Sequence, residues 1–122
     1  MKNRAEEFKI DGKSFVYLDF SGISTDADAA GAIALMKPVI ASYPENSLYT
    51  IADIGGLRFD SGMKGILAEF MAHNKPYVKR GAVVGADGAK KIVCKELSGL
   101  SGRVGMVFAF TREGAVELLL EV

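Results

Sequence analysis

The sequence has few of the residues on which most catalytic and metal sites depend. It contains one cysteine, one histidine and no tryptophan, so an internal disulfide is excluded and a zinc site built from several such ligands is not expected. Cys94 lies in a helical apolar pattern and is expected to be a small core residue. His73 lies at an expected helix end, where a histidine more often faces the last carbonyls than acts as a base. The sequence therefore predicts no catalytic residue, no metal site and no cofactor.

The sequence also lacks a charge imbalance and long apolar runs. Lys plus Arg and Asp plus Glu number 15 each, which gives a formal net charge of zero, so no overall field favours nucleic acid or an anionic membrane surface. No run approaches the roughly 18 apolar residues needed to span a bilayer, and no signal-peptide pattern is found. We therefore expect a cytoplasmic protein that does not span a membrane. Because the net charge is zero, copies of the protein do not repel one another through an overall charge, and this weakly favours a homodimer.

What the sequence does contain is typical of one globular domain. Its 122 residues are close to the commonest domain size. Hydrophobic residues make up 49% and charged residues 25% of the chain, a balance that supports a packed core rather than disorder. We expect one domain that spans residues 1–122.

Strand and helix patterns alternate along most of the chain. Strands separated by helices predict right-handed crossovers and a parallel sheet, whereas Asp11-Gly12 readily adopts positive φ and predicts an opening hairpin. The expected fold is α/β, with a single sheet of about five strands and about four helices. The sheet is expected to be mostly parallel, with an N-terminal antiparallel hairpin. The expected strands are Phe8 with Ile10, Phe15–Phe20, Leu48–Ile54, Ala82–Gly85 and Met106–Phe110.

The helices are predicted from capping residues and from apolar residues spaced by three and four. Within the first of them, Pro38 lacks an N–H and its ring clashes with the preceding turn, so a kink or a break is expected after Met36. The expected helices run from Ser24–Asp26 to Tyr43-Pro44, from Asp60-Ser61 to His73–Pro76, through Val93, Leu97 and Leu100 to Ser101-Gly102, and from Thr111 to Leu120.

Two loops follow parallel strands, at the edge of the sheet where ligands of open α/β folds collect. The first, between Ile51 and Gly62, contains two carboxylates, an arginine and a hydroxyl group: Asp53, Asp60, Arg58 and Ser61. Such a carboxylate pair can bind a metal ion or act as acid and base, but nothing in its spacing requires either role.

The stretch from Ile51 to Leu67 resembles the central segment of STAS domains, found in sulfate-transporter tails and in bacterial anti-sigma factor antagonists of the SpoIIAA type. Their pattern is a buried strand ending in Asp, a loop with an aliphatic residue and a Phe, then Asp-Ser-Ser-Gly or Asp-Ser-Thr-Gly at a helix start. The residues from His73 to Gly85 resemble a group of uncharacterised bacterial proteins placed beside STAS and lipid-transfer domains. The residues that match the STAS pattern are Asp53, Leu57, Phe59, Asp60, Ser61 and Gly62.

This resemblance implies a noncatalytic regulatory module that binds a protein partner, such as a kinase or an anti-sigma-like protein. Ser61 would be the phosphorylated residue, and Asp53, Arg58 and Asp60 would join it at the partner surface. The motif has two hydroxyl residues where this chain has one, and the loop is one residue shorter. The alternative is that Asp60 or Ser61 is only a helix cap.

The second loop is a candidate anion site. Gly85, Gly88, Lys90 and Lys91 can place backbone N–H groups and positive charge at a helix start, although the spacing is not that of a phosphate-binding loop. The alternative is a plain turn with a solvated lysine pair.

A second functional hypothesis is a small-molecule or lipid binder with an apolar pocket between helices. Lys90 and Lys91 would then lie near an anionic head group. An enzyme is the third hypothesis, since no residue pattern demands catalysis.

Overall fold

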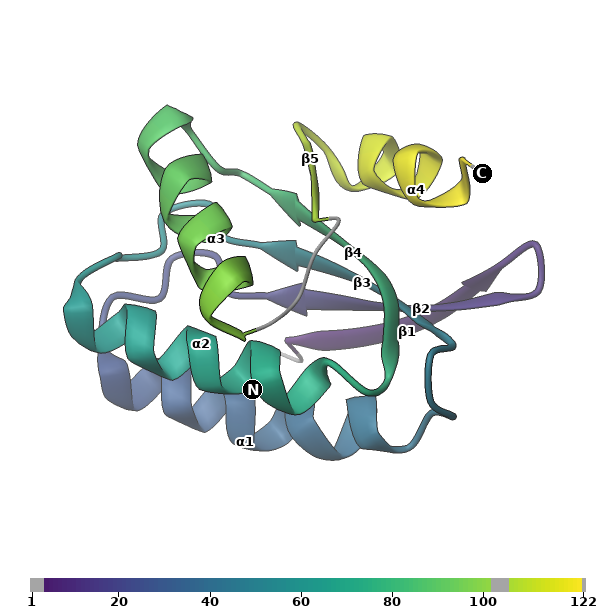
Figure 1. The fold of residues 1–122 in the computed structure, drawn as a ribbon, viewed down its shortest axis with the longest axis horizontal. Coiled ribbons are helices and arrows are strands. Elements are labelled where there is room, and N and C mark those ends of the chain that lie inside the picture. The colour runs from purple at the N-terminus through teal and green to yellow at the C-terminus, as the bar shows by residue number, and fades with distance from the viewer. Residues whose placement is uncertain (1–3, 102–105, 122) are drawn as a thin grey trace.

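The computed structural model describes residues 4–101 and 106–121, with side chains for 4–97 and 106–121. Its elements form one five-stranded sheet in the order β1-β2-β3-β4-β5, in which only the β1–β2 pair is antiparallel (Figure 1). The expected α/β architecture is confirmed. The elements are β1 (Ala5–Ile10), β2 (Lys13–Asp19), α1 (Asp26–Ala41), β3 (Leu48–Asp53), α2 (Ser61–Asn74), β4 (Val78–Val84), α3 (Gly88–Ser101), β5 (Val107–Ala109) and α4 (Arg112–Leu120).

The opening hairpin turns at the predicted dipeptide. Asp11 has φ 54° and Gly12 has φ 76°, and Ile10 pairs with Lys13 across this two-residue turn. Positive φ at both central positions matches the twist of the flanking strands, which is why Asp-Gly is favoured there.

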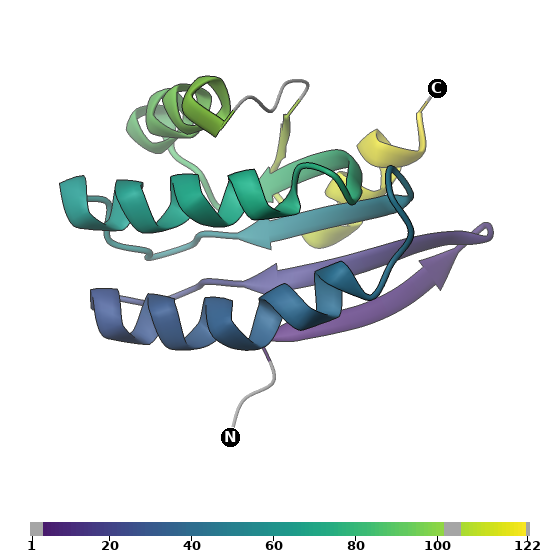
Figure 2. The same cartoon turned by 60° about the horizontal axis from the view of Figure 1, so that its bottom comes forward.

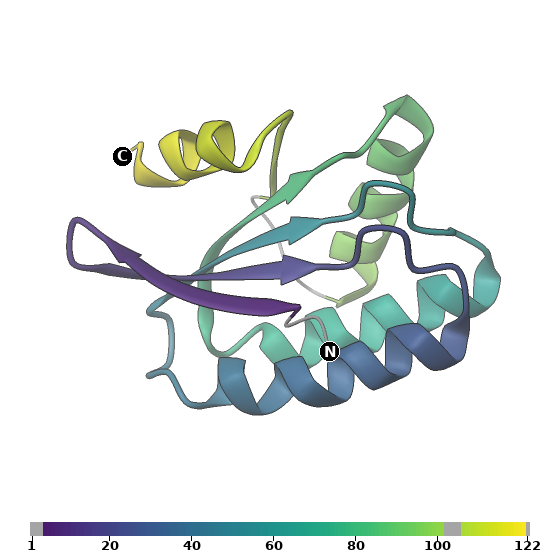
Figure 3. The same cartoon turned by 180° about the vertical axis from the view of Figure 1, so that it is seen from behind.

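The helices cover the two faces of the sheet unequally. Helices α1, α2 and α3 pack against the face that carries Val16 and Leu18, whereas α4 packs against the opposite face, with Phe15 and Ile51. Figures 2 and 3 show α4 apart from the other three helices. Arg112 ties the start of α4 to the hairpin, because its guanidinium lies 4.6 Å from the ring centre of Phe8 and 4.7 Å from that of Tyr17.

Pro38 does not break the first helix, so of the kink or break expected after Met36 the break is wrong. Helix α1 continues past it to Ala41 and is capped at Ser42, so the expected end at Tyr43-Pro44 is also two residues late. Both Pro38 and Ala34, whose carbonyl loses its helical donor, are exposed. Water can therefore satisfy that carbonyl, and the lost hydrogen bond does not force a break.

The fourth strand starts earlier than predicted, at Val78 instead of Ala82. The apolar pattern does not indicate its first residues, because the charged pair Lys79-Arg80 interrupts that pattern there. Arg80 donates to the carbonyl oxygens of Leu119 at 3.1 Å and Glu121 at 2.7 Å, so its charge stabilises the C-terminal end of α4. The third helix ends at Ser101 as expected, while Gly102 and the side chain of Leu100 lie outside the described residues.

No helix in the two described stretches is both long enough and apolar enough to cross a membrane.

The position of Pro38 predicts that replacing it will stabilise the fold. Pro38→Ala restores an N–H for the Ala34 carbonyl, and we expect the free energy of unfolding to rise by about 2 kcal/mol, less than the full helix penalty because proline also restricts the unfolded chain. Urea denaturation measures this change. Lys37→Ala is the control, with a change within about 0.5 kcal/mol. A lower stability of Pro38→Ala than of the parent would contradict this account of α1.

Candidate functional site

The start of α2 is capped by Asp60. Its Oδ1 accepts the backbone N–H of Met63 at 2.9 Å, which is the usual bond of a helix N-cap. Ser61 is the first helical residue, and it is exposed to solvent. The sequence left open whether Asp60 or Ser61 caps the helix. The cap is Asp60, and Ser61 is exposed.

Arg58 joins the starts of α1 and α2. Its Nε lies 2.8 Å from Asp60 Oδ2, and its Nη2 contacts Asp26 Oδ1. A side-chain carbon at Gly62 would lie 2.7 Å from Asp26 Oδ2, so a larger residue there would displace the Asp26 carboxylate from the start of α2. One guanidinium thus holds two carboxylates at a solvent-exposed helix start, where ion pairs contribute little to stability.

Asp53 does not join this cluster. It lies on the α4 face of the sheet, where its Oδ2 accepts the phenol of Tyr17 at 2.5 Å and its Oδ1 accepts the N–H of Gly55 at 3.0 Å. The structure therefore brings Arg58, Asp60 and Ser61 together and separates Asp53 from them.

The second loop is organised by its own carboxylate. Asp87 Oδ1 accepts the N–H of Lys90 at 2.9 Å, which places a negative charge where an anion would bind the start of α3. Lys91 Nζ lies 5.7 Å from the ring centre of Phe108. Gly85 has φ +84°, and a side-chain carbon there would lie 2.8 Å from Gly55 N. Gly85 is thus explained by a close backbone approach, and Gly88 faces open space.

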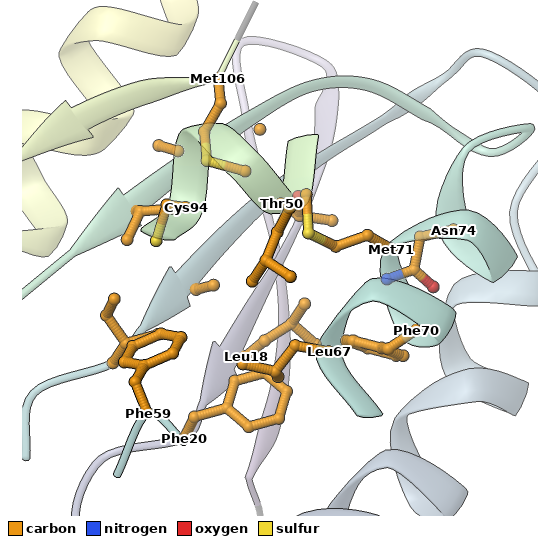
Figure 4. Close-up of a pocket in the computed structure, with 16 residues that line it drawn as sticks. Leu18, Phe20, Thr50, Phe59, Leu67, Phe70, Met71, Asn74, Cys94 and Met106 are labelled. Atoms are coloured by element: carbon orange, nitrogen blue, oxygen red, sulfur yellow. The ribbon is translucent and has the colours of Figure 1, made fainter. Parts of the chain in front are cut away.

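A cavity lies between the sheet, α2 and α3. It offers about 70 Å³ of space that water-sized molecules can reach. Figure 4 shows side chains from β2, β3, α2, α3 and the loop before α2 around it. It is lined by Leu18, Phe20, Thr50, Ala52, Ile54, Phe59, Leu67, Phe70, Met71, Asn74, Gly81, Ala82, Val83, Cys94, Leu97 and Met106.

Two polar side chains interrupt this apolar wall. Thr50 is 4% and Asn74 2% exposed. Asn74 Oδ1 lies 2.9 Å from His73 Nδ1. Among the described residues of the wall, Cys94 is the one with a titratable side chain. Burial raises the pKa of its thiol to about 11, so at neutral pH the thiol is uncharged and unreactive. Lys90 and Lys91 do not line the cavity.

The sequence indicated an apolar pocket between helices but not its polar residues. Thr50 was the signal for one of them, since it is a polar residue in the middle of the apolar run from Leu48 to Ile54. Asn74 gave no such signal, because asparagine is ordinary at a helix end. In the part of the chain with described side chains, no group of three or more His, Cys, Asp or Glu residues is placed to hold a metal ion.

Comparison with protein-family models and with curated proteins finds no match for the chain. The STAS resemblance of the segment from Ile51 to Leu67 therefore stays a prediction, and the function has to be argued from the geometry.

Two half-buried phenols, those of Tyr17 and Tyr43, predict an alkaline limit to stability. Burial, and then a hydrogen bond to Glu7, raises the pKa of Tyr43 to about 12. Burial, and then the hydrogen bond to Asp53, raises the pKa of Tyr17 further. The folded protein keeps both protons above about pH 10, where an unfolded tyrosine loses its own. The stabilisation is therefore complete below about pH 10 and declines as the pH rises toward the folded-state values.

The measurement is urea unfolding of the parent, Tyr17→Phe and Tyr43→Phe at about pH 8 and about pH 11. The stability advantage of the parent over each variant should shrink at the higher pH, because phenylalanine has no proton to lose. An advantage that grows with pH would show that the folded state favours the ionised phenols.

Proposed function

We propose that this protein acts by binding a small apolar molecule in the cavity between the sheet, α2 and α3, without catalysing a reaction. The observation that supports this most is the cavity itself: a mostly apolar hollow with a few buried polar groups is the usual form of a ligand site. Protein interiors are otherwise packed with few voids larger than a water molecule. The neutral thiol of Cys94 adds to the apolar wall and offers no nucleophile.

The test is to fill the cavity and measure the loss of an apolar probe. n-Pentane is titrated into the ¹⁵N-labelled protein while amide shifts are followed by NMR. Ala52 lines the cavity, and we expect Ala52→Leu to weaken n-pentane binding at least about tenfold, because the added side chain takes the ligand's space.

Ala72→Leu is the matched control, since it makes the same change at an exposed position of α2. It should bind n-pentane like the parent. If the parent shows no saturable shifts around the cavity, or if Ala52→Leu binds as well as the parent, ligand binding in this cavity is ruled out.

A second candidate function is that of a noncatalytic partner-binding module, the hypothesis that the STAS resemblance favours. Its support is the exposed Ser61 at the start of α2, which directly follows Asp60, the partner of the Arg58 guanidinium. A phosphate there would add a charge of about −1.5 to −2 near free helix N–H groups and would change how a partner meets this surface.

This second candidate predicts phosphorylation of Ser61 in the cells that make the protein. Peptide mass spectrometry of the chain isolated from those cells should place a phosphate on Ser61. Ser24, which is also exposed, is the comparison site and should carry none. Phosphate on Ser24 alone, or on neither serine under all growth conditions, would count against the switch.

A further inference from the structure

The polar residues of the cavity lie toward one end of it. Thr50 is the third residue of β3, and Asn74 is the last residue of α2. The end of α2 lies beside the start of β3, since the N–H groups of Asn46 and Ser47 donate to the carbonyls of Pro76 and Tyr77 at 2.9 and 3.1 Å. Phe59 precedes α2 and lines the other end. In Figure 4, Asn74 and Thr50 lie on the side of Met71, away from Phe59.

Each of the two polar residues has a hydrogen-bonding group that no described residue engages. Oδ1 of Asn74 is engaged with His73 Nδ1, while Figure 4 shows the amide nitrogen turned toward Met71 and the cavity. Neither this nitrogen nor the Thr50 hydroxyl has a hydrogen-bond partner among the described residues. No fully enclosed side-chain nitrogen or oxygen of those residues lacks a partner. These two atoms are therefore not fully enclosed, and both belong to residues that line the cavity.

The wall favours a neutral ligand. None of the described residues that line the cavity is an Asp, Glu, Lys, Arg or His. A charged group moved from water into such a site would lose its hydration without gaining an opposite charge, and this loss is large. The anionic head group considered from the sequence has no counter-charge here, because Lys90 and Lys91 lie outside the wall.

The two open groups indicate what the neutral head group is. The Asn74 nitrogen is a donor only, and the Thr50 hydroxyl can donate as well as accept. A carbonyl oxygen has two lone pairs and can accept from both. The space of about 70 Å³ is several times what one water needs, which limits the ligand to roughly five or six heavy atoms unless the helices move.

We infer that the cavity selects short, neutral carbonyl compounds such as ketones, esters or amides, with the carbonyl oxygen held by Thr50 and Asn74 and the apolar chain directed toward Phe59 and Phe20. This inference rests on the proposed ligand-binding function and specifies its ligand class.

The experiment compares three probes of similar length: diethyl ketone, n-pentane and valerate. Each is titrated into the parent, Thr50→Val, Thr50→Ser and Asn74→Leu, and dissociation constants are taken from amide shifts. Because valine matches threonine in shape, Thr50→Val should weaken diethyl ketone about tenfold and leave n-pentane unchanged or tighter. Thr50→Ser keeps the hydroxyl and should bind the ketone nearly as the parent does. Valerate should not saturate any of the four proteins.

The outcomes separate the two proposals. If n-pentane binds and neither Thr50→Val nor Asn74→Leu changes the ratio of ketone to pentane affinity, the carbonyl preference is overturned and the ligand-binding function stands. Valerate binding more tightly than the ketone also overturns it. If no probe binds the folded parent, both proposals fall. Asn74→Leu gives an independent result should Thr50→Val not fold, which the amide spectrum shows directly.

Discussion

The burial of β3 between two helical layers is the constraint that arranges the rest of the molecule. Successive side chains of a strand point to opposite faces, so Leu48, Thr50 and Ala52 face the α1–α3 layer while Tyr49 and Ile51 face α4. The same alternation places Thr50 in the cavity wall. It also turns Asp53 to the α4 side, where it accepts the Tyr17 phenol.

The cavity follows from small residues on neighbouring strands. Ala52 of β3 and Gly81 of β4 line it, and Gly81 pairs with Thr50 across the two strands. A larger side chain at either position would reach into the space under α2 and α3. Leaving such space unfilled costs stability, because the lining atoms lose packing partners. A chain that keeps small residues here retains a hollow that its core could otherwise close, and this agrees with the proposed ligand site.

The sequence predicted the element order and the hairpin because those depend on local signals. Asp11-Gly12 and the Asp60 cap act within a few residues. The β4 boundary was wrong because the contact that explains it is distant: Arg80 donates to carbonyls 38 to 41 residues further along the chain. No local pattern shows that a charged residue inside a strand will stabilise the end of a helix on the far face.

The sequence did not predict that Asp53 is separated from Asp60, and the reason is again a distant contact. Asp53 ends β3 and Asp60 follows it by seven residues, and the sequence predicted that both lie at one edge of the sheet. The face of the sheet on which each carboxylate lies depends on how the helices are distributed. A mostly apolar run such as Leu48 to Ile54 lacks the regular alternation of polar and apolar residues from which that face could be inferred. The asymmetric cover, with three helices against one, is a property of the whole chain.

The loop before α2 connects the two functional candidates physically. Leu57 is buried and Phe59 lines the cavity, while Arg58 and Asp60 between and after them are exposed and paired with each other. A molecule that pressed on Phe59 would therefore act one residue away from both members of that ion pair and two from Ser61. The inner side of this short segment would then contact the proposed ligand, and its outer side would contact the proposed partner. Since a ligand can shift a surface only by binding its two arrangements differently, coupling between ligand binding and partner binding requires that the ligand change the position of Phe59 or of α2, both of which line the cavity.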